Sequence, residues 1–304
     1  MIIDSHCHAW AYWPYNPPTP DPEWRGRIEQ LLHEMALNGV AQAVLICAQI
    51  DHNPDNNAYV AEQARRFPAQ VHQFVDLDSE WSPTYHQPGA AERLRRMAAA
   101  WPIKGFTHYL RRAEDGVWLT SAEGLALFQA AADLGLIASL SCYPHQQAAV
   151  RQVARRFPQT PILCHHMGWP THGLGEARQN LDEVLASAEC PNIYIKLSGF
   201  AYAAQVAWEY PYREGQWIVR ALYDRFGPRL CWGSDYPVVR FYMTYRQALE
   251  AFRTHCDFIS PADQALIAGG TLASLLGPAA GASSLRITLS NGHPQISQIE
   301  SEAS

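Results

Sequence analysis

The chain has 304 residues, of which 48% are hydrophobic and 17% charged, and its formal net charge is −6 at pH 7. This length suits one large α/β domain and can bury a substantial core without disulfides or a structural metal. The acidic balance lacks the basic surface that nucleic acids require, so we expect a small-molecule substrate and no nucleic-acid partner.

Short apolar segments alternate with helix-length amphipathic segments along most of the chain. The predicted strands are 1–5, 42–48, 71–77, 103–107, 136–141, 161–165, 192–198 and 229–234. The predicted helices are 27–37, 56–66, 91–99, 121–134, 146–156, 175–188, 212–226 and 245–255. Eight such units in succession are typical of a parallel barrel, so we predict a single-domain (β/α)8 TIM barrel.

We place the barrel at residues 1–277, ending with a helix at 261–276, and predict a tail of uncertain order at 278–304. From the N-terminal sequence MIIDSHCH we expect no signal peptide and no membrane-spanning segment. The seven cysteines form no CxxC pair, which indicates a reducing compartment, and we expect a cytoplasmic location. A homo-oligomer is expected from general frequency alone.

The first strand ends in the sequence Asp-Ser-His-Cys-His. Side chains two apart on a strand point the same way, so we expect Asp4, His6 and His8 to face the barrel interior together. Two imidazoles at the mouth of a barrel can chelate a metal or polarise a carbonyl group. The alternative is a pair of hydrogen-bonded structural histidines.

Two further strand ends carry chemically active side chains. Asp235 stands where the apolar eighth strand meets a loop, and its carboxylate can accept a proton from water or bind a metal. The alternative for Asp235 is an Asx turn or a helix cap. The sixth strand ends in His165 and His166, which point to opposite faces if the strand is regular, so we expect only one of them in the interior.

Five motifs at strand ends resemble the amidohydrolase superfamily, particularly the amidohydrolase-related group that contains sugar lactonases and 2-pyrone-4,6-dicarboxylate lactonase. These motifs are DSHCHAW, KGFTH, HHMGWP, NIYIKLSG and CWGSDYPV. In that family the sixth-strand histidine precedes x-Gly, which implies His166 rather than His165. The resemblance therefore implies that His6, His8, His166 and Asp235 are the catalytic residues and the ligands of one divalent metal, with zinc favoured.

The sequence departs from that family at two metal positions. Members with a single catalytic metal generally have a fifth-strand histidine, whereas this strand offers Ser139, Ser141 and Cys142, with no histidine before His145. Members with two metals use a carboxylated lysine at the end of the fourth strand, and Lys104 stands near the start of that strand. The resemblance thus implies a weakly bound metal or none.

Lys196 alternates with aliphatic residues on the seventh strand, so its side chain is expected in the barrel interior. A buried ammonium group needs a partner, and we expect Asp4 to provide it. The pair would then be structural, which we favour over a catalytic Schiff-base lysine.

Several residues near strand ends could bind a polar substrate, although each could equally be a solvated charge or a loop contact. The candidate substrate-binding residues are His108, Arg111, Arg240, Tyr236 and Trp169. The candidate aromatic walls are Tyr12, Trp13, Tyr15, Trp169, Tyr202 and Tyr236. Arginine in such a place would favour a carboxylate on the substrate.

We therefore expect a hydrolase that opens a sugar lactone or a carboxylated lactone by attack of water. Asp235 would be the general base, and the histidines or a divalent metal would polarise the carbonyl group. One alternative is a metal-dependent decarboxylase or hydratase that acts on an unsaturated or aromatic carboxylic acid. Another is a member of the family that binds a ligand without turnover.

Overall fold

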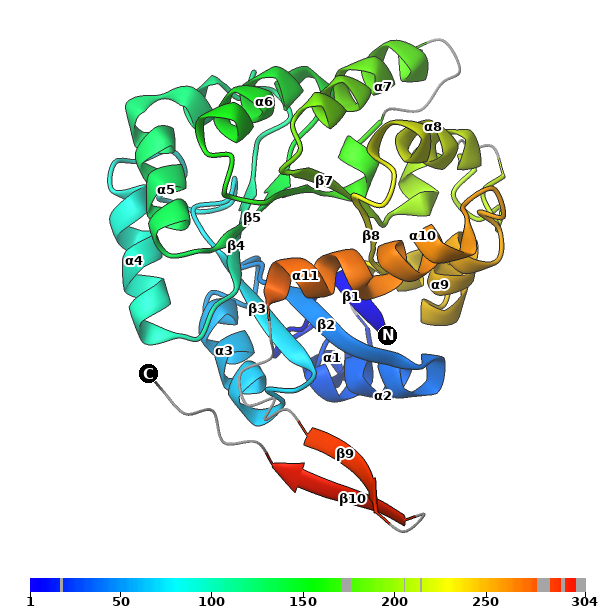
Figure 1. Cartoon of the computed structure of the whole chain (residues 1–304). Coiled ribbons are helices and arrows are strands. Elements are labelled where there is room, and N and C mark those ends of the chain that lie inside the picture. The colour runs from blue at the N-terminus through cyan, green and yellow to red at the C-terminus, as the bar shows by residue number, and fades with distance from the viewer. Residues whose placement is uncertain are drawn as a thin grey trace.

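The computed structural model describes residues 1–16, 19–170, 176–204, 206–213, 215–277, 285–290 and 293–298 (Figure 1). Eight parallel strands follow one another around the sheet in chain order, with helices between them. The sheet closes where Cys7 of the first strand bridges to Tyr236 after the eighth. The prediction of a single (β/α)8 TIM barrel is confirmed.

Each predicted strand and helix overlaps an observed element, with ends that differ by a few residues. The barrel strands are β1 (Ile2–Cys7), β2 (Val40–Ile46), β3 (Val71–Asp76), β4 (Gly105–Tyr109), β5 (Ile137–Ser141), β6 (Ile162–Cys164), β7 (Ile193–Leu197) and β8 (Leu230–Trp232). The helices are α1 (Pro22–Arg25), α2 (Ile28–Asn38), α3 (Asn56–Arg66), α4 (Ala90–Ala100), α5 (Ala122–Asp133), α6 (Gln147–Arg156), α7 (Glu176–Ala186), α8 (Gln216–Phe226), α9 (Tyr245–Arg253), α10 (Pro261–Ala265) and α11 (Thr271–Leu276).

The strands separate two apolar layers. On β7, Ile193, Ile195 and Leu197 pack in the large cluster between the strands and the helices, whereas Tyr194 packs against the smaller cluster inside the barrel. Lys196 is fully buried on the same face as Tyr194. The predicted alternation of this strand is therefore confirmed, because successive side chains of a strand face opposite sides of the sheet.

Strand β1 departs from the predicted alternation. Its pairing with β2 shifts register between Asp4 and Cys7, which marks a β-bulge, and such a bulge inserts an extra residue into one strand. Ile3 consequently packs inside the barrel, and Asp4 contacts Tyr245 of helix α9. The expectation that Asp4 shares a face with His6 is therefore wrong, because the bulge changes the parity between them.

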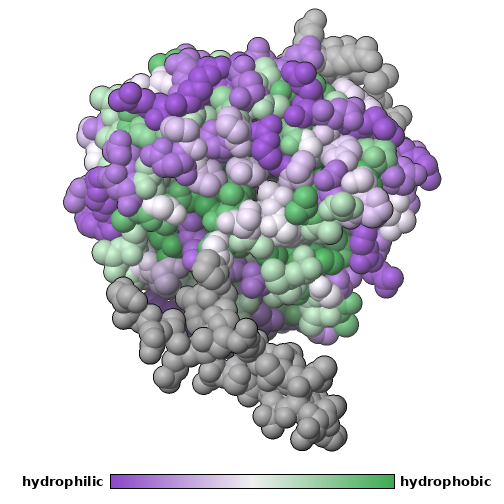
Figure 2. Space-filling model, viewed as in Figure 1, coloured by the Kyte–Doolittle hydropathy of each residue, from purple (hydrophilic) through white to green (hydrophobic). Residues whose placement is uncertain are grey.

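Helix α11 closes the end of the barrel at which the strands begin (Figure 1). Its Leu272 and Leu276 pack with Ile3 and the other apolar residues of the interior. Seen from this end, hydrophilic residues predominate around the rim, over the outer helices (Figure 2). Lys104 donates to the Leu276 carbonyl at 3.2 Å, so this lysine lies at the closed end, as its place before β4 suggested.

After the barrel, β9 (Leu285–Ser290) and β10 (His293–Gln298) form an antiparallel pair within the predicted tail. The rest of that tail, residues 278–284, 291–292 and 299–304, lies outside the described residues. The boundary between barrel and tail stays a prediction. Among the described residues, no helix is both long and apolar enough to cross a membrane.

Gly105 provides a test of how tightly the barrel interior is packed. A Cβ atom at this position would lie 2.4 Å from the Ile137 carbonyl oxygen of β5 and 2.9 Å from the Phe74 ring. We expect Gly105→Ala to lower the free energy of unfolding by roughly 2–4 kcal/mol, because backbone must move to admit the methyl group. Urea denaturation measures this loss.

The matched control is Gly39→Ala, at a position where nothing lies within 4 Å of the new Cβ and only the positive φ of 68° is unfavourable. We expect a loss of about 1 kcal/mol there, the cost of a left-handed conformation for alanine. Equal losses in the two variants would contradict the packing argument.

Candidate active site

A cavity of about 700 Å³ opens at the carboxyl ends of the strands, opposite helix α11. Its lining residues come from the loops that follow β1, β2, β3, β4, β6, β7 and β8. They are His8, Tyr15, Ala48, Gln49, Ile50, Asp51, Trp81, Tyr109, His166, Trp169, Tyr202, Asp235 and Val238. The volume is typical of a small-molecule site, and this face is where barrel enzymes carry their active sites.

His6, His8 and Asp235 form a compact triangle at the base of this cavity. The Asp235 Oδ1 atom lies 3.5 Å from His6 Nε2 and 3.3 Å from His8 Nε2. His8 Nδ1 lies 2.7 Å from the Ile46 carbonyl oxygen, so Nδ1 carries a proton, and Nε2 is the nitrogen that faces Asp235. His6 Nε2 is buried without a hydrogen-bond partner.

Asp235 is held by the closure of the barrel and by Tyr202. Its backbone N–H donates to the His6 carbonyl at 2.7 Å, and its φ of 60° turns the chain sharply after β8. The Tyr202 hydroxyl donates to Oδ2 of the carboxylate. Burial raises the pKa of Asp235, but His166, His8 and Tyr202 outweigh it and lower that pKa below its ordinary value. The carboxylate is therefore ionised at neutral pH.

Both histidines that follow β6 lie against His6. The ring centroids of His165 and His166 are each 4.5 Å from that of His6. The expectation that only one of them enters the interior is wrong, because β6 ends at Cys164 and the chain turns through a positive φ of 46° at His166. Strand alternation no longer applies beyond that point.

His166 presents one nitrogen to the cavity. Its Nδ1 lies 3.0 Å from the Ser198 hydroxyl, which leaves Nε2 as the nitrogen available to a ligand. Burial lowers the pKa of His166 to about 4, so the ring is neutral at pH 7. With Ser198 as the donor to Nδ1, the Nε2–H is a hydrogen-bond donor.

Lys196 lies beneath the triangle in a chain of polar groups. Its Nζ donates to the Ser139 hydroxyl at 2.7 Å and lies 3.3 Å from His6 Nδ1, and Ser139 in turn lies 2.7 Å from His165 Nε2. Burial lowers the pKa of Lys196 to about 7. The prediction that Asp4 pairs directly with Lys196 is wrong, because Asp4 turns toward α9, and its charge acts on the Lys196 pKa without a direct contact.

Of the predicted substrate-binding residues, the structure brings only Trp169 into the cavity wall. His108 is buried and lies 2.9 Å from the Leu77 carbonyl. Arg111 packs over Tyr85 at 4.4 Å. The remaining two are Tyr236, which is buried, and Arg240, which is exposed.

The remaining predicted residues, which are aromatic wall residues and possible metal ligands, lie partly in the cavity lining and partly outside it. Tyr15 and Tyr202 line the cavity, whereas Tyr12 and Trp13 are not among its described lining residues. Cys142 packs in the cluster between the strands and the helices, away from the barrel interior. His145 lies 2.9 Å from the Glu114 carbonyl, outside the cavity.

Sequence reasoning missed several residues of the site. Gln49 and Asp51 line the cavity from the loop after β2, and no sequence signal distinguishes them from other loop residues. The contacts of Ser139 and Ser198 with histidines that follow the neighbouring strand β6 also went unpredicted. Ser139 lies in the middle of β5 and Ser198 directly follows β7, so their place in or next to a barrel strand was the one signal available.

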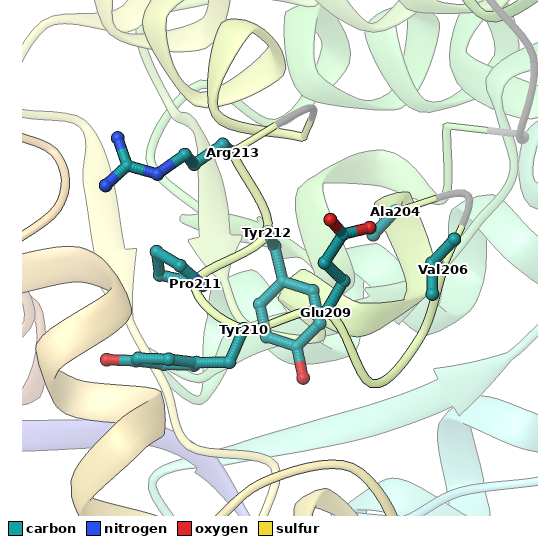
Figure 3. A pocket seen from close by; sticks show the side chains of 7 residues that line it. All are labelled: Ala204, Val206, Glu209, Tyr210, Pro211, Tyr212 and Arg213. Atoms are coloured by element: carbon teal, nitrogen blue, oxygen red, sulfur yellow. The ribbon is translucent and has the colours of Figure 1, made fainter.

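A second, smaller pocket of about 140 Å³ lies on the loop between β7 and α8. Figure 3 shows that the Arg213 guanidinium and the Glu209 carboxylate point away from one another there. Among the described residues that line it there is no histidine and no cluster of convergent polar groups. Of the two pockets, the larger cavity is therefore the candidate active site.

The triangle fits a divalent cation. Nitrogen and oxygen ligands of tetrahedral zinc lie about 2 Å from the metal and so about 3.3 Å from one another. The distances from Asp235 Oδ1 to His6 Nε2 and to His8 Nε2 match this spacing. His6 Nε2 has no hydrogen-bond partner, so it is available as a metal ligand. His6, His165 and His166 form a second group of close nitrogen atoms.

The fold and site define a class. Histidines of β1 and of the segment after β6 lie with an aspartate after β8 around the cavity of a (β/α)8 barrel. This arrangement is typical of barrel hydrolases. The chain belongs to the Amidohydrolase family, whose sequence profile matches residues 3–277. The family resemblance of the strand-end motifs is thus confirmed.

Known relatives agree with this assignment. The chain is 29% identical over 288 residues to an L-fucono-1,5-lactonase from Burkholderia ambifaria, covering 88% of this chain and 92% of that protein. A zinc-bound amidohydrolase from Burkholderia multivorans has a TM-score of 0.70 at 23% identity, over 91% of this chain and 99% of that one. A probable 2-pyrone-4,6-dicarboxylic acid hydrolase from Acinetobacter baumannii has a TM-score of 0.72 at 16% identity, over 90% and 98%. The two structures show a shared fold.

The buried titratable groups predict how stability changes with pH. Burial lowers the pKa of six histidines and so favours their neutral form in the folded chain: His6, His72, His86, His108, His165 and His166. Burial raises the pKa of Asp4 and Asp76 to about 6 and also raises the pKa of Glu80 and Glu114. Between pH 6 and pH 4, unfolding therefore takes up histidine protons and releases carboxyl protons, and the histidines are the larger group.

Because the unfolded chain binds more protons in this range, stability falls as the pH falls, by about 1.4 kcal/mol per pH unit for each net proton taken up. Urea denaturation of metal-free protein at several pH values between 6 and 4 measures this slope. A stability that is constant or rises toward pH 4 would contradict the neutral state of the histidines.

Proposed function

We propose that this chain is a lactonase that opens an uncharged lactone by attack of water. The observation that carries the proposal is the placement of an ionised Asp235 beside His6, His8 and His166 at the base of the cavity. Such a site holds a base for water next to groups that stabilise a developing oxyanion. The similarity to an L-fucono-1,5-lactonase supports the same reaction.

Asp235 acts as the general base that takes the proton of the attacking water. The His166 Nε2–H donates to the carbonyl oxygen and stabilises the negative charge that develops on it. A divalent ion bound by His6, His8 and Asp235, with zinc favoured, would act as a Lewis acid on the carbonyl group and lower the pKa of water. The aromatic walls orient the ring and exclude bulk water.

The lining favours an uncharged substrate over a carboxylated one. Among the described residues that line the cavity there is no lysine or arginine, and two are carboxylates, Asp51 and Asp235. An anionic substrate would lack a cationic partner there. Hydroxyl groups of a sugar lactone can instead donate to Asp51 and Gln49, and its ring can pack against Trp81 and Trp169.

We expect Asp235→Asn to lower kcat for lactone hydrolysis by at least about 10³-fold, because the amide cannot accept the proton of water. Acid release from sugar lactones and from pyrone carboxylates measures both activity and preference. Thermal unfolding of the variant close to that of the wild type shows that the fold is kept. Near-wild-type turnover by this variant would rule out Asp235 as the base.

The wild-type enzyme itself tests the substrate class. Hydrolysis of sugar lactones in preference to pyrone dicarboxylates is the expected result. Decarboxylation or hydration of an unsaturated acid, with no acid released from any lactone, would overturn the proposal.

Metal analysis tests the ion. We expect up to one zinc per chain after dialysis against the metal, and a loss of that zinc in His8→Ala, which removes one of the three ligands. His108→Gln is the matched control, because His108 is a buried histidine outside the triangle. Equal zinc contents in wild type and His8→Ala would contradict the assigned ligands.

A further inference from the structure

We propose that Tyr202 is a further catalytic residue, whose phenol delivers a proton to the oxygen that leaves when the lactone ring opens. The inference rests on the proposed lactone hydrolysis. Tyr202 lines the cavity and donates its hydroxyl hydrogen to Oδ2 of Asp235. Oδ1 of the same carboxylate faces His6 and His8. The proposed base, Asp235, and the Tyr202 phenol are therefore joined by a direct hydrogen bond.

The position of Tyr202 is fixed by its neighbours. Its ring stacks on Trp169, with centroids 5.4 Å apart and planes 14° from parallel, and meets His166 edge-on at 5.3 Å. Gly199 makes this packing possible, since a Cβ there would lie 2.2 Å from the Tyr202 ring and its φ is 69°. These contacts hold the ring so that the phenol points toward Asp235 and the cavity.

Ring opening requires one proton to leave water and one to reach the ring oxygen. The water oxygen bonds to the acyl carbon as its proton passes to Asp235. The bond between the acyl carbon and the ring oxygen then breaks, and its electron pair stays on the ring oxygen, which takes the proton of the Tyr202 phenol. The proton on Asp235 afterwards neutralises the Tyr202 phenolate, so both groups return to their initial states.

This role depends on how basic the leaving oxygen is. A sugar lactone releases an alkoxide, which is strongly basic and needs a proton as it departs. An aryl lactone such as dihydrocoumarin releases a phenoxide, which departs far more readily without one. A general acid therefore matters for the first substrate and little for the second, whereas a residue that only positions Asp235 affects both alike.

The experiment compares Tyr202→Phe with wild type on a sugar δ-lactone and on dihydrocoumarin. We expect kcat for the sugar lactone to fall by about 10²-fold or more, and kcat for dihydrocoumarin to fall much less. Tyr242→Phe is the matched control: its ring packs on Tyr202 at 5.6 Å, but Tyr242 does not line the cavity. We expect this control to behave as wild type on both lactones.

Three outcomes are decisive. A larger loss on the sugar lactone than on dihydrocoumarin, in a variant with a wild-type unfolding midpoint, supports the general acid. An equal loss on both, or no loss on either, overturns the role of Tyr202 and leaves the lactonase proposal standing. Failure of the wild type to hydrolyse any lactone refutes the proposed function, and this inference with it.

Discussion

The site depends on the buried carboxylate of Asp4, which joins the first strand of the barrel to the last. Asp4 accepts hydrogen bonds from the backbone N–H of His6 and from both the backbone and the hydroxyl of Ser234, and Tyr245 adds a fourth from α9. Because Asp4 binds the backbone of His6 and of Ser234, which directly precedes Asp235, this one group ties together the two segments that carry His6 and Asp235.

Beneath Asp235, the interior of the barrel is polar where a barrel of this kind is usually filled with aliphatic side chains. Lys196, Ser139 and His165 form a hydrogen-bonded chain that ends on His6. Lys196 is fully buried. Its Nζ atom contacts His6 and Ser139, and Ser139 also contacts His165. Such a chain limits the rotation of the His6 ring, because Nδ1 is engaged and only Nε2 can reach the cavity.

The order of strands and helices, the barrel and the positions of His6, His8 and Asp235 could all be predicted from the sequence, since they follow from local periodicity and from where polar residues interrupt apolar strands. The inward position of both His165 and His166 could not, because the alternation rule ends where β6 ends. Nor could the outward turn of Asp4, which comes from a bulge at the seam of the barrel. Contacts such as that of Tyr202 with Asp235 join residues far apart in the sequence and leave no local pattern.

The side chains of the cavity come from two groups of strand ends, one that carries the reactive groups and one that carries other lining residues. The reactive side chains follow β1, β6, β7 and β8, whereas Gln49, Trp81 and Tyr109 reach the cavity from β2, β3 and β4. Changes on the second side alter the walls of the cavity and leave the cluster of His6, His8, His166 and Asp235 in place. This division lets one scaffold accept new molecules through mutations away from that cluster, and it identifies the β2–β4 side as the region to randomise when a different substrate is wanted.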